Sequence, residues 1–120
     1  MHAICHTPTF TRDAATAGMT NEELASLEDM LARNPSAGDE IVGSGGCRKV
    51  RLAGKGKGKS GGYRVIHFFT GPDLPVFLLT VFAKNERANL SKAERNQLAR
   101  LTDVLASEYR KKIAKSGEKP

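Results

Sequence analysis

Residues 45–69 read GGCRKVRLAGKGKGKSGGYRVIHFF, and the rest of the chain is arranged around this stretch. Strand-like runs stand on both sides of a loop in which lysine alternates with glycine. Seven cations occur from Arg48 to Arg64 without an intervening acid. Lysines are rarely buried unpaired, and glycine lets backbone amides approach a bound group closely. The stretch therefore predicts an exposed loop that grips phosphate groups, with RNA as the inferred polyanion.

Length and charge limit the class of protein. The chain has 120 residues, 39% of them apolar, which suits one domain with a small core. We expect this domain to span residues 1–114 and a flexible basic tail to span residues 115–120. The net charge of +6 and a pI near 9.6 favour a polyanion or an acidic protein as the partner. A membrane surface is the weaker interpretation, because the charge lies in a glycine-rich loop and not on an amphipathic helix.

The two cysteines indicate a reducing compartment. Cys5 and Cys47 are too few for a disulfide framework or a four-cysteine zinc site, so we expect free thiols and a cytoplasmic location. The sequence has no export signal and no apolar run long enough to span a membrane. Three residues near the N-terminus have side chains of the types that bind a soft metal ion: His2, Cys5 and His6. Such a group at a chain terminus is more often a chance arrangement than a metal site. We therefore predict no metal site and no cofactor.

Capping patterns locate the helices. Pro8 opens a short helix over residues 8–17. Thr20 and Glu23 form a capping box for a second helix, which ends before Pro35. Ser91 and Glu94 form another box for a C-terminal helix that runs to about Ile113.

Apolar runs locate the strands. Residues 2–7 form a short first strand, and residues 35–46 are a connection rich in turn formers. Three further strands follow, Cys47–Ala53, Tyr63–Thr70 and Val76–Ala83, with a turn at residues 71–73. The last two runs are apolar on both faces, which is typical of central strands in a covered sheet. Short connections make the three strands antiparallel neighbours, and the fold class is α+β.

A nucleotide-binding motif is present only in a relaxed form. Residues 53–60 read AGKGKGKS, close to a phosphate-binding loop with alanine in place of the first glycine. That loop requires a helix N-terminus directly after it, whereas Gly61, Gly62 and a strand follow here. We therefore reject nucleotide hydrolysis.

The remaining candidates for chemistry lie at one edge of the predicted sheet. Arg64 opens one central strand and Lys84 ends its neighbour, so antiparallel pairing brings both beside the glycine-lysine loop. His67 within a central strand is more often a core histidine than a base. Glu94 is a helix cap, and Glu86 is an ion-pair partner more often than a proton carrier.

Three segments carry a resemblance to a known family. Residues 45–51, 54–66 and 78–86, together with the order of strand, two helices, three antiparallel strands and C-terminal helix, resemble the RelE/ParE superfamily of bacterial toxins. The glycine-lysine loop followed by Gly-Gly-x-Arg is most similar to its HigB branch. The likeness covers about residues 20–106.

This resemblance implies a toxin of a type II toxin–antitoxin system. It implies a ribosome-dependent, metal-free endoribonuclease in which a ribose 2′-hydroxyl attacks the adjacent phosphate of translated mRNA. The partners would be the ribosome, mRNA and an antitoxin that often carries a helix-turn-helix DNA-binding domain. The positions that match the family's catalytic basic groups are Arg64, Lys84, Lys57 and Lys59, and those assigned to RNA or ribosome binding are Arg48, Lys49, Arg51, Lys55, Phe82 and Tyr63.

One position departs from the family pattern. Relatives often have a tyrosine near Phe82, where a phenol can stack on a nucleotide and bond to it; Tyr63 or Tyr109 are the candidates to replace it. Two alternatives to the nuclease stay open: a ParE-like toxin that inhibits gyrase without cutting RNA, and a basic module that only binds RNA or the ribosome.

Overall fold

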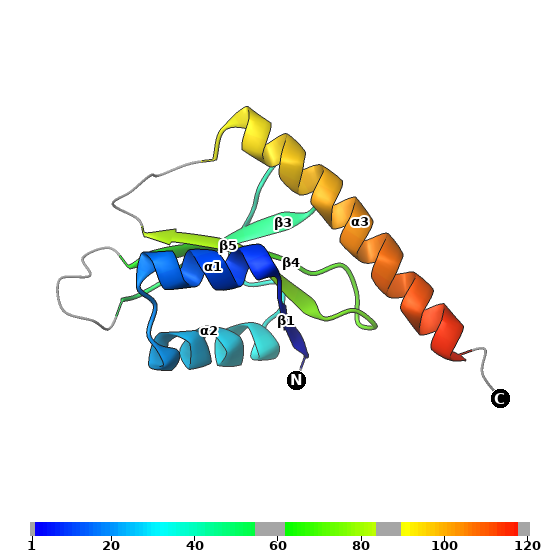
Figure 1. Cartoon of the computed structure of the whole chain (residues 1–120), viewed down its shortest axis with the longest axis horizontal. Coiled ribbons are helices and arrows are strands. Elements are labelled where there is room, and N and C mark those ends of the chain that lie inside the picture. Colours follow the sequence, from blue (N-terminus) through cyan, green and yellow to red (C-terminus); the bar gives the residue numbers. More distant parts are fainter. Residues whose placement is uncertain (1, 55–61, 84–89, 118–120) are drawn as a thin grey trace.

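The computed structural model describes residues 2–54, 62–83 and 90–117, the last five by their backbone alone. The elements follow one another along the chain as an α+β protein (Figure 1). Their bounds are β1 Ile4–His6, α1 Pro8–Ala17, α2 Asn21–Arg33, β2 Asp39–Glu40, β3 Cys47–Leu52, β4 Tyr63–Phe68, β5 Val76–Ala83 and α3 Lys92–Gly117.

The strands form one five-stranded sheet in the order β1-β5-β4-β3-β2. β1 pairs with β5 in parallel, and the other pairs are antiparallel. This confirms that β4 and β5 are internal strands and that β3, β4 and β5 are antiparallel neighbours. The connection 35–46 contains a strand that the sequence did not predict: Asp39 and Glu40 of β2 pair with Lys49 and Arg48. Two exposed acids between turn formers carry no strand pattern, because their apolar periodicity is absent.

α1 and α2 cover one face of the sheet, and their ends follow the predicted caps. Thr7 caps α1, and the capping box of Thr20 and Glu23 opens α2 with both reciprocal hydrogen bonds present. The apolar sides of the two helices meet one face of the sheet in a buried cluster, formed by Phe10, Ala14, Ala17, Leu27, Leu31, Val50, Tyr63, Val65, Val76, Leu78 and Val81. Leu27 and Leu31 therefore place the apolar side of α2 in the core.

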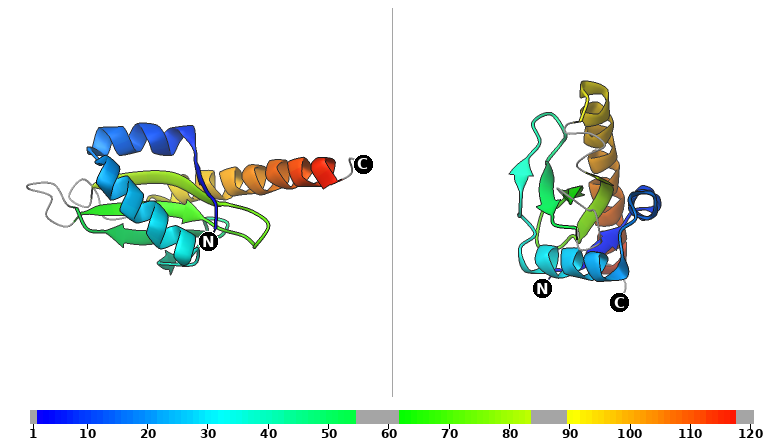
Figure 2. Two further views of the ribbon diagram at one scale, coloured as in Figure 1. Left: turned by 90° about the horizontal axis from the view of Figure 1, so that it is seen from below. Right: turned by 90° about the vertical axis from the view of Figure 1, so that its left-hand side faces the viewer.

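α3 covers the other face and projects beyond the sheet (Figure 2). Leu98, Leu105 and Tyr109 pack against a second buried cluster of Cys47, Ile66, Phe68, Phe77, Leu79 and Phe82. The predicted capping box is present, since the Glu94 amide donates to Ser91 Oγ at 3.1 Å and the Ser91 amide donates to Glu94 Oε1 at 2.9 Å. The predicted end near Ile113 is wrong by about one turn, because the backbone stays helical to Gly117.

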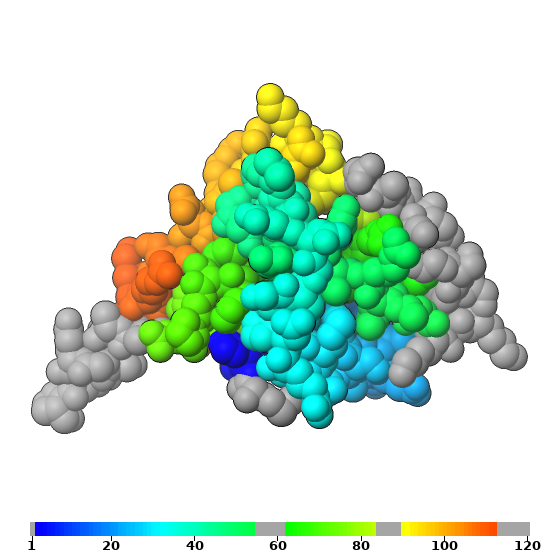
Figure 3. All heavy atoms as spheres, turned by 180° about the vertical axis from the view of Figure 1, so that it is seen from behind, coloured from blue at the N-terminus to red at the C-terminus, as the bar shows by residue number. Residues whose placement is uncertain are grey.

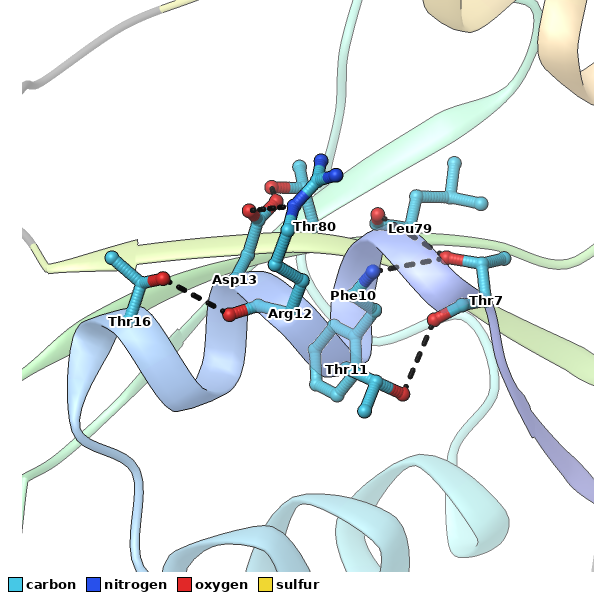
Figure 4. A network of polar contacts seen from close by, with 8 residues as sticks. All are labelled: Thr7, Phe10, Thr11, Arg12, Asp13, Thr16, Leu79 and Thr80. Carbon is cyan, nitrogen blue, oxygen red and sulfur yellow. Dashed lines mark hydrogen bonds and ion pairs between the residues drawn. The ribbon is translucent and has the colours of Figure 1, made fainter.

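A bulge in β5 decides which of its side chains face α3. His67 pairs with Leu78 and Ile66 pairs with Thr80, so Leu79 is the extra residue. Leu79 and Phe82 consequently both join the cluster under α3. The Thr80 hydroxyl donates to Asp13 Oδ2 at 2.6 Å and ties β5 to α1 (Figure 4).

Candidate RNA-binding and catalytic site

The start of β4 and the end of β5 lie side by side, as the sequence predicted. Tyr63 pairs with Ala83, and Arg64 pairs with Phe82. Residues 55–61 connect to this end of the sheet between β3 and β4, and residues 84–89 follow β5. The predicted lysines at positions 55, 57, 59 and 84, and Glu86, therefore lie outside the described residues.

Arg64 lies opposite a second arginine. On the other side of β4 its register partner is Arg51 of β3, so the two side chains are direct cross-strand neighbours. Such neighbours have Cβ atoms about 4.5–5.5 Å apart, and like charges in these positions destabilise a sheet. Arg51 is exposed and Arg64 is half-buried, with a buried Nε that has no hydrogen-bond partner in the described part of the chain. Neither guanidinium has a carboxylate within ion-pair distance there.

The other two cations of β3 lie next to acids. Glu40 and Asp39 of β2 are opposite Arg48 and Lys49 in register. A guanidinium N–H of Arg48 also donates to the Gly38 carbonyl at 3.0 Å. In Figure 3 the connection 34–46 and β3 occupy the middle of the back face, between α2 and α3. Because β2 ends before it reaches Arg51, no acid among the described residues lies opposite the arginine pair in register.

The aromatic candidates are in the core. Tyr63 is fully buried, and its hydroxyl donates to Glu23 Oε1 at 2.9 Å. Phe82 is 6% exposed and belongs to the cluster under α3. Both rings pack in the core in the described structure, and their role as stacking residues stays a prediction. Tyr109 lies near the turn 71–75, at the opposite end of the sheet, with its ring edge against Phe77 at a centroid distance of 5.9 Å.

His67 is a core histidine, as the sequence favoured. Its side chain is fully buried, and Nε2 lies 2.9 Å from the Ala37 carbonyl oxygen, so we assign the ring proton to Nε2. Burial lowers the pKa of His67; the Ala37 carbonyl opposes this effect, and the nearby Arg48 charge adds to it. A group without access to solvent is a poor proton carrier for a bound RNA.

The N-terminal histidines and cysteine do not gather into a metal site. His6 Nε2 lies 2.8 Å from Glu28 Oε2, and the His2 ring meets Phe69 edge-on. Cys5 packs toward the cluster under α3. Among the described residues no three histidine, cysteine, aspartate or glutamate side chains come together as ligands.

The loop that resembles a nucleotide-binding motif leads into a strand. Gly62 adopts a positive φ of 65°, and β4 begins at Tyr63. A nucleotide-binding loop needs a helix N-terminus directly after it to hold the phosphate. Here a strand begins at that place, which agrees with the rejection of nucleotide hydrolysis.

A hollow of about 310 Å³ lies between α1, β5 and α3. Its floor is apolar, with Leu79, Leu98 and Leu101, and it contains the acids Asp13 and Glu94. Carboxylates repel a polyanion, so this hollow does not suit RNA, and the arginine pair remains the candidate phosphate site.

Comparison with known proteins supports the fold and shows the family. The sequence model described as the RelE toxin of the RelE / RelB toxin–antitoxin system matches residues 2–119. The chain belongs to the RelE toxin family. A solved structure of a mutant of E. coli toxin RelE in the free state has the same fold, with a TM-score of 0.52 and 19% sequence identity over 71% of this chain and 85% of that one. This RelE-family toxin has no helix, within its described residues, that combines the length and hydropathy of a membrane span.

Proposed function

We propose that this RelE-family toxin is a ribosome-dependent endoribonuclease that cleaves translated mRNA. The observation that carries the proposal is the cross-strand pair of Arg51 and Arg64, which lacks a carboxylate partner in the described part of the chain. Two adjacent guanidinium groups supply donors in a fixed geometry that matches a phosphate group. A bound phosphate would offset their mutual repulsion.

The proposed reaction uses the substrate's own nucleophile. The ribose 2′-hydroxyl oxygen attacks the adjacent phosphorus, the bond from phosphorus to the 5′ oxygen breaks, and the products are a cyclic phosphate and a 5′-hydroxyl. One proton leaves the 2′-hydroxyl and another reaches the 5′ oxygen. The chemical step therefore requires charge stabilisation and two proton transfers.

The roles of the residues follow from this scheme. Arg64, with Arg51 beside it, stabilises the negative charge that develops on the phosphorane. Lys57, Lys59 and Lys84 are the candidates for the proton transfers and for charge on the leaving oxygen. Lys55, Arg48 and Lys49 contribute to the grip on RNA and the ribosome, and we expect that grip to weaken steeply as salt concentration rises.

The family implies an antitoxin partner. We infer that this antitoxin carries a helix-turn-helix DNA-binding domain and that both proteins act in the cytoplasm. A small reading frame of that kind beside the toxin gene would support this inference.

Mapping mRNA 5′ ends after induction tests the proposal. Cleavage in phase with codons, confined to translated regions, is the expected result. Intact transcripts together with DNA-damage signalling would favour a gyrase-inhibiting toxin, and intact transcripts without such signalling would favour a basic RNA-binding module. Arg64→Ala is expected to abolish toxicity while antitoxin binding persists; loss of both would point to misfolding.

A further inference from the structure

The first residue of β4 is anchored by a buried hydrogen bond that the reaction scheme does not use. Tyr63 and Glu23 are both fully buried, and the phenol donates to Glu23 Oε1 at 2.9 Å. The same oxygen accepts the Thr20 amide at 2.9 Å, and the Glu23 amide donates to Thr20 Oγ1 at 3.1 Å. A strand end is thereby bonded to the first turn of α2.

The position of Tyr63 gives this anchor its importance. Tyr63 pairs with Leu52 at the end of β3 and with Ala83 at the end of β5. Tyr63 therefore lies where β3 and β5 end and β4 begins. Figures 1 and 2 show the first turn of α2 at this same end of the sheet.

Arg64 is the next residue along the strand and faces the opposite side of the sheet. Its guanidinium can match a phosphate only if the backbone at the start of β4 stays in register with Arg51 and Phe82. Strand ends open more readily than strand centres, because they have fewer packed neighbours. A displacement of about 1 Å at a reacting group lowers a catalysed rate by about 100-fold.

We propose that Tyr63 and Glu23 are positioning residues, which hold the start of β4 so that Arg64 is directed at the phosphate. This inference rests on the proposed function. It assigns Tyr63 a role in the reaction that differs from stacking on a base, since its ring faces α2 and not solvent.

The test removes one hydroxyl at a time from the full-length toxin. Tyr63→Phe keeps the buried ring and deletes the bond to Glu23. Thr80→Val is the matched control, because it deletes a hydroxyl that likewise donates to a helix carboxylate, Asp13, but lies on β5 and not on the strand that carries Arg64. For each protein the measurements are the thermal midpoint, the affinity for ribosomes carrying mRNA, and the single-turnover cleavage rate well below the midpoint.

Positioning and simple stabilisation predict different results. If Tyr63 positions Arg64, Tyr63→Phe lowers the cleavage rate about 10- to 100-fold while ribosome affinity stays within about twofold, and Thr80→Val cleaves at the wild-type rate. If the bond only stabilises the fold, both variants have lower midpoints and both cleave at the wild-type rate. That second result would overturn the inference.

A readout that does not depend on cleavage separates this inference from the proposed function. Wild-type toxin that fails to cleave mRNA on ribosomes would contradict the proposed function. The Nε–H resonance of Arg64, followed by NMR during titration with inorganic phosphate, then decides the positioning role. A response in the wild type that is lost or weakened in Tyr63→Phe supports it; an equal response in both proteins, or none in the wild type, overturns it.

Discussion

Arg51 on β3 and Arg64 on β4 are opposite each other in register, two cations on neighbouring strands with no carboxylate within ion-pair distance in the described part of the chain. An acid at one of these two positions would make the pair stabilising. Such pairs occur between β2 and β3, where Asp39 is opposite Lys49 and Glu40 is opposite Arg48. The arginine pair instead opposes folding locally and favours anion binding.

Removal of one arginine is expected to separate stability from activity. For Arg64→Gln we expect unchanged stability or a gain of about 0.2–1 kcal/mol in the free energy of unfolding, because the repulsion from Arg51 is relieved. The cleavage rate on ribosomes should fall by about 100- to 1,000-fold, the loss typical of a donor to a developing oxyanion. Urea denaturation and single-turnover cleavage measure the two effects. A variant that is both less stable and fully active would contradict the assignment.

The sequence predicted the elements better than it predicted their contacts. The apolar run Val76–Ala83 has the observed bounds of β5, and both capping boxes are present. The juxtaposition of Arg51 with Arg64 was not predicted, because strand patterns give the order of neighbours without their register. The hydrogen bond from Tyr63 to Glu23 joins residues that are 40 positions apart and leaves no local signal in the sequence. The role of each residue therefore had to be predicted from its residue type alone.

Gly62 is expected to be irreplaceable at the base of the glycine-lysine loop. Its φ is 65°, and an added Cβ would overlap the Leu52 carbonyl oxygen and lie 2.9 Å from the Gly54 nitrogen. Both neighbours are backbone atoms that cannot rotate away. Gly62→Ala should therefore lower the free energy of unfolding by more than about 1 kcal/mol, as measured in urea.

Gly71→Ala is the control for this substitution. A Cβ at Gly71 would meet nothing within 4 Å, and its φ is not in the left-handed region. Its free energy of unfolding should change by no more than about 0.5 kcal/mol, the range typical of open surface positions. Equal losses of unfolding free energy at Gly62 and Gly71 would show that the nearby backbone atoms do not determine the effect of the substitution at Gly62.

Cys47 is expected to be inert in the folded toxin. Burial raises the pKa of its thiol to about 11, although a hydrogen bond with Ser44 opposes the shift, and the side chain is fully buried. The thiolate is the reactive form. In a Cys5→Ser variant, which leaves Cys47 as the remaining thiol, reaction with an aromatic disulfide at about pH 8 should occur only at the rate of unfolding. A rapid burst under native conditions would contradict the burial of Cys47.

His67 is expected to make the fold less stable in mild acid. Its pKa is lowered in the folded state by burial, so the unfolded chain binds more protons as the pH falls through the ordinary histidine range. By linkage, the free energy that neutral His67 contributes to folding is present above its unfolded-state pKa of about 6.5. This contribution is lost as the pH falls from there toward the lower pKa of the folded state. His67→Gln, whose amide N–H can still donate to the Ala37 carbonyl, removes this titration but leaves His2 and His6 in place. The wild type should therefore lose more free energy of unfolding than the variant between about pH 7.5 and about pH 5. Parallel curves for the two proteins would show that His67 does not carry the pH dependence.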